Sequence, residues 1–181
     1  MILGKNAILE EIANGNIIID PFSLSQLGPN SYDVRLDRFF YNLVWISGQP
    51  WYVYKTSMEE IELDGGTVLG KTMEKVGTHG NIVASMRARS SVGRMGITVC
   101  RDAGLGDAGY DNYWTMELTG YSSTGNPVVR YGQRVAQMVF YRVEDPGEYD
   151  GQYTTSKWPE CMVPARWRSN IVLSIDDIPK E

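Results

Sequence analysis

An all-β fold, built as a barrel or a sandwich, is the fold class that this sequence of 181 residues predicts. Short apolar or aromatic segments recur along the chain with Gly, Pro, Asn and Asp between them, a pattern typical of many short strands joined by turns. The 19 glycines suit a fold with many turns. Helical spacing of apolar residues is hard to find beyond the N-terminal region, so we expect one short helix and otherwise strands.

The helix is expected over Lys5–Asn14, the first segment with a clear apolar face. Ile8, Leu9 and Ile12 share that face, since residues one and four positions apart lie together on a helix. Gly15 follows directly and is a suitable residue to end the helix.

The first strand is expected at Ile17–Asp20, an isoleucine-rich run that Pro21 ends because proline cannot donate to a sheet ladder. The later apolar runs predict further strands at Tyr32–Leu36, Phe39–Ile46, Trp51–Tyr54, Thr67–Leu69, Ile82–Ser85, Ile97–Cys100, Tyr113–Leu118, Val128–Arg130 and Val135–Val143. From Asp145 the chain becomes richer in Pro, Gly, Tyr and charge. We therefore expect residues 1–145 to form a β-barrel domain with the N-terminal helix, and residues 146–181 to form an arm or lid of the same domain.

Composition and charge argue against several classes of protein. A net charge of −5 is unsuited to a non-specific nucleic-acid binder, which needs a basic face. Two cysteines and one histidine cannot build a zinc site from Cys and His alone. They also indicate no disulfide framework, so a cytoplasmic protein is expected. The N-terminus lacks a signal-peptide pattern, and no apolar run reaches the roughly 20 residues of a membrane span.

The segment Arg89-Ser-Ser-Val-Gly-Arg94 places charge and hydroxyl groups between two apolar runs. Serine hydroxyls, exposed main-chain N–H groups and the planar charged fork of arginine together suit the oxygens of a polyphosphate. The alternative is a solvated turn whose arginines form surface ion pairs. The segment by itself does not decide between the two.

Two further segments carry single carboxylates. Ala103–Tyr110 is dense in glycine, and its Asp107 is suited to accept a hydrogen bond from a sugar hydroxyl, or to bond to its own main chain in a tight turn. Glu117 lies in the apolar run Tyr113–Leu118. A buried carboxylate is costly unless it is paired or functional, and burial favours proton transfer near neutral pH. The alternative is an edge position with Glu117 facing water.

Taken in order, these segments resemble the dCTP deaminase branch of the dUTPase-like superfamily. The resemblance rests on Arg89–Arg94, Ala103–Tyr110, Thr115–Leu118 and Tyr131–Phe140, and on the earlier Ile19–Phe22 and Pro29–Leu36, with matching gaps between them. It extends from near residue 1 to about residue 160. It implies a distorted β-barrel or jelly roll, assembled as a homotrimer with active sites between subunits, that acts on dCTP or dUTP.

The resemblance also implies roles for individual residues. Glu117 matches the catalytic proton shuttle, and Arg94 and Ser90 match the groups that orient it and the attacking water. The implied substrate-binding residues are Arg89, Ser91, Ala103, Asp107, Thr115, Met116, Tyr149 and Lys157. Of these, Asp107 matches the acid that holds the deoxyribose 3′-hydroxyl. Mg²⁺ would enter with the triphosphate, and zinc is not expected, because the chain lacks the His/Cys set of zinc deaminases.

The sequence departs from the deaminase pattern at three places. Cys100 stands where histidine is common, Arg101-Asp102 precedes Ala103 in place of a small hydroxyl residue, and Cys161 replaces a glutamine expected after Lys157. Some members of the branch also convert the product to dUMP, and Ala103-Gly104 resembles those members. Two alternatives stay open: a dUTPase that hydrolyses dUTP with Asp33 or Asp107 guiding the water, and a non-catalytic jelly-roll binding module.

Overall fold

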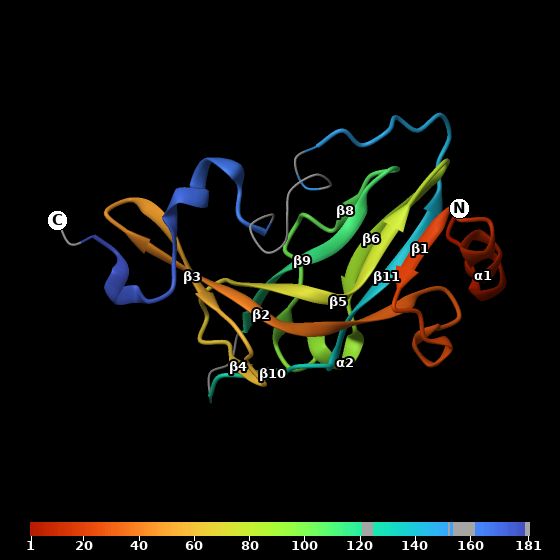
Figure 1. The fold of residues 1–181 in the computed structure, drawn as a ribbon. Coiled ribbons are helices and arrows are strands. Elements are labelled where there is room, and N and C mark those ends of the chain that lie inside the picture. Colours follow the sequence, from red (N-terminus) through yellow and green to blue (C-terminus); the bar gives the residue numbers. More distant parts are fainter. Residues whose placement is uncertain (121–124, 152, 154–161, 180–181) are drawn as a thin grey trace.

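A mainly β chain with one short N-terminal helix is seen in the computed structural model, which describes residues 1–120, 125–151, 153 and 162–179 (Figure 1). The helical elements are α1 (Lys5–Ala13), η1 (Leu24–Gln26), α2 (Ser90–Gly93), η3 (Ala165–Asn170) and η4 (Ile175–Asp177). The strands are β1 (Ile17–Asp20), β2 (Tyr32–Ile46), β3 (Gln49–Lys55), β4 (Glu60–Glu62), β5 (Val68–Thr78), β6 (Ile82–Ala88), β7 (Ile97–Thr98), β8 (Leu105–Gly106), β9 (Asp111–Gly120), β10 (Val128–Arg130), β11 (Arg134–Arg142) and β12 (Ile171–Val172).

Ten strands of the described chain form one curled sheet in which β7, β9, β5, β2, β11, β6 and β8 are successive neighbours. β1 pairs with β5 beside this path, while β3 and β12 extend the sheet from β2. The 15-residue β2 connects the β11 side of the sheet with the β3 side, because its first half pairs with β11 and its second half pairs with β3. The curl encloses a core that contains Tyr32, Phe40, Met116 and Phe140, each 0% exposed.

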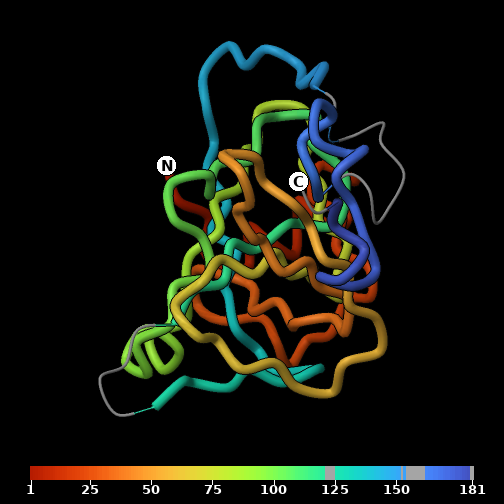
Figure 2. The backbone as a smooth tube through the Cα atoms, turned by 90° about the vertical axis from the view of Figure 1, so that its left-hand side faces the viewer, coloured from red at the N-terminus to blue at the C-terminus, as the bar shows by residue number. Residues whose placement is uncertain are grey.

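The C-terminal residues pack on the part of the sheet formed by β2 and β3. β12 pairs in parallel with β3, and the Asn170 side chain donates to the Pro50 carbonyl over 2.8 Å. Met162 and Val163 are buried in a second apolar cluster with Tyr41, Tyr52 and Leu69. The chain after β11 first loops outward as an arch, drawn in lighter blue in Figures 1 and 2.

Sequence patterns located the longer elements, but the short strands β4, β8 and β12 were not predicted, and β2 and β5 were predicted with the wrong bounds. The predicted strands Tyr32–Leu36 and Phe39–Ile46 form one continuous strand, β2, in which a register shift against β5 follows Leu36. The predicted strand Thr67–Leu69 is only the start of β5, which runs to Thr78. Its continuation was missed because it is polar in sequence, although most of it is buried.

Long-range partners explain how this polar half of β5 is buried. Glu74, 0% exposed, accepts bonds from the Arg35 main chain and Nε and from Gln26 Nε2 at 2.7–2.9 Å. Lys71 Nζ lies 2.8 Å from an Asp37 carboxylate oxygen. Because a buried charge is tolerated when it is paired and hydrogen-bonded, these contacts let charged residues occupy a central strand.

A buried carboxylate also attaches α1 to β11. Glu11 is 3% exposed; it accepts a 2.7 Å bond from Asn16 Nδ2 and a second bond from Arg142 Nη2. The bond from Asn16 and the charge and bond of Arg142 lower the pKa of Glu11 below its ordinary 4.5, against the opposing effect of burial. The ionised form is therefore favoured in the folded state.

Because this pKa is lowered on folding, the stabilisation is present above 4.5 and is lost as the pH falls through the lowered value. Replacing Glu11 with Gln should lower the free energy of unfolding by about 1–3 kcal/mol at neutral pH, and by less well below pH 4.5. Urea unfolding of both proteins at the two pH values measures this. An equal difference at both would contradict the assignment.

Among the described residues, no helix is long and apolar enough to cross a membrane.

Candidate functional site

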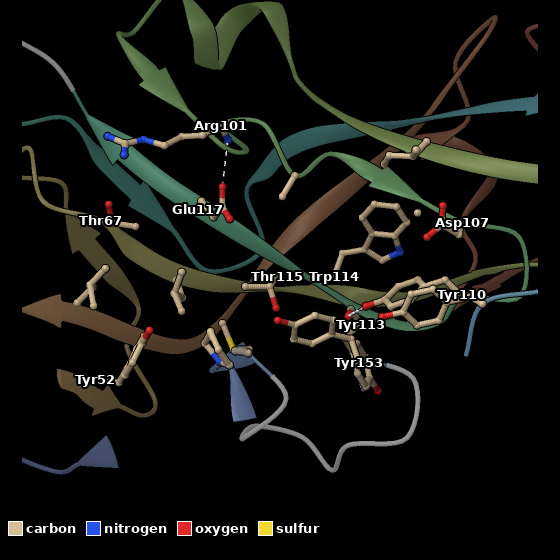
Figure 3. A pocket seen from close by; sticks show the side chains of 18 residues that line it. Tyr52, Thr67, Arg101, Asp107, Tyr110, Tyr113, Trp114, Thr115, Glu117 and Tyr153 are labelled. Carbon is tan, nitrogen blue, oxygen red and sulfur yellow. Dashed lines mark hydrogen bonds between the residues drawn. The ribbon is translucent and has the colours of Figure 1, made fainter. Parts of the chain in front are cut away.

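A pocket of about 530 Å³ lies on the outer face of the sheet, opposite the main core (Figure 3). Its floor comes from β9 and β5, and the chain between Arg101 and Tyr110 forms one wall. Met162 and Pro164 of the C-terminal segment and residues of β2 and β3 complete it. This volume is in the range of small-molecule sites.

Strand alternation along β9 places Glu117 in this pocket. Met116 and Leu118 are 0% exposed and face the core, and Trp114, 5% exposed, packs in the core and also lines the pocket. Thr115 and Glu117 point to the other face, as successive residues of a strand do, and both line the pocket. Glu117 is half-buried there, which is neither of the simple outcomes left open by the sequence, a core position or an edge facing water.

Main-chain bonds on both sides hold Glu117 in place. Its N–H donates to the Val99 carbonyl over 2.9 Å. Its Oε2 accepts a bond from the Arg101 N–H at 3.2 Å, drawn as a dashed line in Figure 3. The carboxylate thus lies against the chain that leads into the segment Ala103–Tyr110, and Glu117 lines the pocket. A carboxylate held in this way can exchange protons with a bound ligand.

A β-bulge shapes the floor beside Thr115. The register of β5 against β9 shifts between Lys71 and Lys75. The Thr72 hydroxyl fills the gap, since it donates to the Glu74 carbonyl at 2.7 Å and accepts from the Trp114 N–H at 2.9 Å. Bulges re-aim neighbouring side chains.

Glycines in the loop allow its close approach to the sheet. A Cβ on Gly106 would lie 2.4 Å from the Trp114 ring, and a Cβ on Gly104 would lie 2.8 Å from the Met86 carbonyl oxygen. The turn at Asp107 uses its main chain, because its carbonyl accepts from Tyr110 N at 3.1 Å and from Thr78 Oγ1 at 3.4 Å. The exposed Asp107 side chain is labelled at the end of the pocket away from Thr67 and Tyr52 (Figure 3).

Tyr149 ties the arch after β11 to this end of the pocket. Its N–H donates to the Ala108 carbonyl over 2.8 Å, and its ring packs edge-on against Tyr110 with 5.6 Å between centroids. Tyr110 packs edge-on against Trp114 in turn, at 5.3 Å. An aromatic wall therefore faces Asp107.

Cys100 is a half-buried thiol next to this site. Burial raises the pKa of Cys100, the negative charge of Glu117 raises it further, and a hydrogen bond with the Ala103 main chain opposes both. The thiol is therefore protonated at neutral pH. Its acidity depends directly on whether Glu117 carries a charge.

We expect iodoacetamide to alkylate Cys100 slowly at neutral pH and faster as the pH rises past the ordinary value of 9.0, because the thiolate is the reactive form. Glu117→Gln should move this pH profile to lower pH, since it removes the nearby charge. Mass spectrometry of the peptide that contains Cys100 gives the profile. An unchanged profile in the variant would show that the two groups do not interact.

The arginine–serine segment forms α2 and lies outside the pocket. Ser90, Ser91 and Arg94 are exposed, and Arg89 is partly buried. Arg89 Nε lies 3.2 Å from Asp33 Oδ2, and Arg134 Nη1 lies 3.8 Å from the same oxygen. Burial raises the pKa of Asp33, and these two guanidinium groups oppose that effect. Asp33 thus fixes one edge of the Arg89 guanidinium.

The sequence-predicted site residues consequently fall into separate groups. Those that line the pocket are Ala103, Asp107, Thr115, Glu117 and Tyr149. The α2 group of Arg89, Ser90, Ser91 and Arg94 does not line it, and the Met116 side chain is buried in the core. Lys157 lies outside the described residues.

Several pocket residues were not predicted from the sequence. Tyr113 is in the same alternating set as Thr115 and Glu117, so its place on β9 was a usable signal. Leu43, Tyr52 and Leu69 come from other strands and reach the pocket only through sheet pairing. Among the described residues, no group of three or more His, Cys, Asp or Glu could hold a metal ion.

Comparison with known proteins adds independent information. A family model described as dCTP deaminase-like matches residues 2–143. A dCTP deaminase, dUMP-forming, of Leptospira biflexa is 34% identical over 166 residues, which cover 87% of this chain and 92% of that protein. A protein of the same name from Beutenbergia cavernae is 30% identical over 186 residues, covering 94% of this chain and 96% of that one.

The fold is shared with a solved structure. The crystal structure of 2′-deoxycytidine 5′-triphosphate deaminase from Agrobacterium tumefaciens superposes with a TM-score of 0.63 at 23% identity. The match covers 78% of this chain and 48% of the other, so this chain spans about half of that solved chain.

Proposed function

Because the chain belongs to the dCTP deaminase-like family, we propose that it deaminates dCTP to dUTP with release of ammonia. The observation that carries this proposal is the Glu117 carboxylate, held by the Arg101 N–H on the pocket face of β9. A proton-transfer group in a pocket of suitable size is what hydrolytic deamination of a base requires.

In the proposed reaction, Glu117 takes a proton from a water molecule, whose oxygen attacks C4 of cytosine. Glu117 passes this proton to N3, then takes the second proton from the new C4 hydroxyl and gives it to the amino group, so that the C4–N4 bond breaks, the C4 carbonyl forms and ammonia leaves. Thr115 and Ala103 line the pocket together with Glu117, where a base would be held. Asp107, exposed at the far end, would accept a hydrogen bond from the 3′-hydroxyl of deoxyribose.

The triphosphate would be bound by α2 of a second copy of the chain. Ser90, Ser91 and Arg94 are exposed and do not line the pocket of their own chain. Hydroxyl groups and an exposed guanidinium on one turn suit phosphate oxygens. We therefore propose a homotrimer, in which Arg94 and Ser90 of one subunit lie beside the phosphates and orient Glu117 of the next subunit and the attacking water. Mg²⁺ would arrive bound to the phosphates, which supply oxygen ligands of the kind it prefers.

The product of the curated relatives is named as dUMP. We propose that this chain also hydrolyses the dUTP it forms to dUMP and diphosphate. A dUTPase without deaminase activity is the second candidate, because Asp33 and Asp107 remain available to guide water toward a phosphate. Only deamination makes use of a carboxylate at Glu117.

Incubation with dCTP or dUTP in the presence of Mg²⁺ tests the proposal. Nucleotides are separated by chromatography, and ammonia and diphosphate are assayed in parallel. We expect dCTP to disappear with one ammonia released per nucleotide, and dUMP to accumulate. Consumption of dUTP alone would establish the dUTPase alternative. Failure to bind either nucleotide would support a non-catalytic module.

A further inference from the structure

The pocket continues beyond Glu117 into an apolar end that the proposed reaction of dCTP does not use. Sheet register defines its position. Leu69 on β5 lies directly opposite Glu117 on β9, and Tyr41 on β2 lies opposite Leu69. Two residues after Tyr41 on β2, Leu43 lies opposite Tyr52 on β3. With neighbouring strands about 4.8 Å apart, the step from β9 to β3 is roughly 14 Å.

This apolar end consists of Leu43, Tyr52, Leu69, Met162 and Pro164, with Thr67 at its edge. Tyr52, Leu69 and Met162 are 6%, 8% and 4% exposed, so they form fixed walls in the second apolar cluster. None of these six side chains is charged, and the charged group on this side of Glu117 is the exposed Arg101 side chain, which also lines the pocket (Figure 3). Water in such a cavity has few polar partners, and an apolar group that displaces it gains free energy.

The proposed substrate orientation directs one edge of the base toward this end. Asp107 and the Tyr110 wall lie on one side of Glu117, and Thr67 and Tyr52 are on the other (Figure 3). With the sugar at Asp107 and C4 at Glu117, the ring edge that contains C4 and C5 points away from the sugar. The C4 amino group must stay against Glu117 to receive a proton. The free space therefore faces C5.

We propose that the apolar end is a subsite for an apolar substituent at C5, and that the protein acts on C5-alkylated or alkynylated deoxycytidine triphosphates. This inference rests on the proposed function. The step balances as for dCTP: water adds at C4, the C4–N4 bond breaks, ammonia leaves, and the C5-substituted dUTP retains its substituent. One added carbon group in an apolar pocket changes specificity by about 10- to 200-fold.

The test compares dCTP with 5-propynyl-dCTP by the ratio of their kcat/KM values for ammonia release. We expect the wild-type protein to favour the propynyl substrate by about 10-fold. Leu43→Phe, which fills the apolar end, should reverse this ratio. Leu173→Phe is the matched control, because Leu173 is 72% exposed. If Leu43→Phe does not fold, as judged by circular dichroism, Thr67→Leu fills the same space from its edge.

Binding provides a readout that does not depend on turnover. In titration calorimetry, 5-propynyl-dUTP should bind about 10-fold more tightly than dUTP. The subsite would be overturned if 5-propynyl-dUTP bound no more tightly than dUTP. It would also be overturned if Leu43→Phe lowered the affinity for both nucleotides by the same factor. Normal deamination of dCTP with rejection of the propynyl substrate would overturn the subsite and leave the proposed function standing. Absence of ammonia from both substrates, with tighter propynyl binding intact, would overturn the proposed function alone.

Discussion

Replacing Glu117 with glutamine is expected to lower the rate of ammonia release from dCTP by about 10²- to 10⁴-fold, the usual contribution of a general acid–base group. Glutamine has nearly the same shape, and its amide oxygen can still accept the bond from the Arg101 N–H. The fold and the shape of the pocket should therefore be kept. The capacity to take a proton from water and return it to N3 and N4 is lost.

Binding and turnover separate this role from a structural one. The affinity for dCTP, measured by titration calorimetry, should change by less than about 3-fold because the sugar and phosphate contacts are elsewhere. Glu144→Gln makes the same replacement at an exposed site outside the pocket and serves as the control. If Glu117→Gln releases ammonia at near wild-type rate, Glu117 is not the proton shuttle.

Mixing two inactive variants is expected to restore activity if each site is shared between subunits. Glu117→Gln and Arg94→Gln should each be inactive as pure proteins. In a cyclic trimer formed from equal amounts of both, about one quarter of the sites would combine an intact Glu117 with an intact Arg94. Activity should therefore rise from near zero to about a quarter of the wild-type value after subunit exchange.

The double variant Glu117→Gln/Arg94→Gln controls this experiment, because mixing it with either single variant creates no intact site. Arg94 is exposed, so its loss is not expected to unfold the chain. Size-exclusion chromatography with light scattering measures the oligomeric state of each mixture. If the two single variants exchange subunits and recover no activity, Glu117 and Arg94 act within one chain or Arg94 is not part of the site.

The amino-acid sequence by itself determined the elements that depend on local pattern. Helical spacing located α1, and β9 and β11 follow from runs of apolar residues between turn signals. Alternation along β9 also put Thr115 and Glu117 on one face and Met116 on the other. The order of the polar segments indicated the family, which the match over residues 2–143 confirms. Such features are visible in sequence because they involve neighbours a few residues apart.

Tertiary structure decided the features that depend on distant partners. β5 reads as polar in sequence, yet Glu74 and Lys71 are buried because Arg35 and Asp37 meet them across the β2–β5 pair. The apolar end of the pocket likewise exists only where β2, β3, β5 and the C-terminal segment come together. Whether a charge is neutralised, or an apolar side chain lines a cavity, depends on residues far away in the chain. Local periodicity contains no information about those partners.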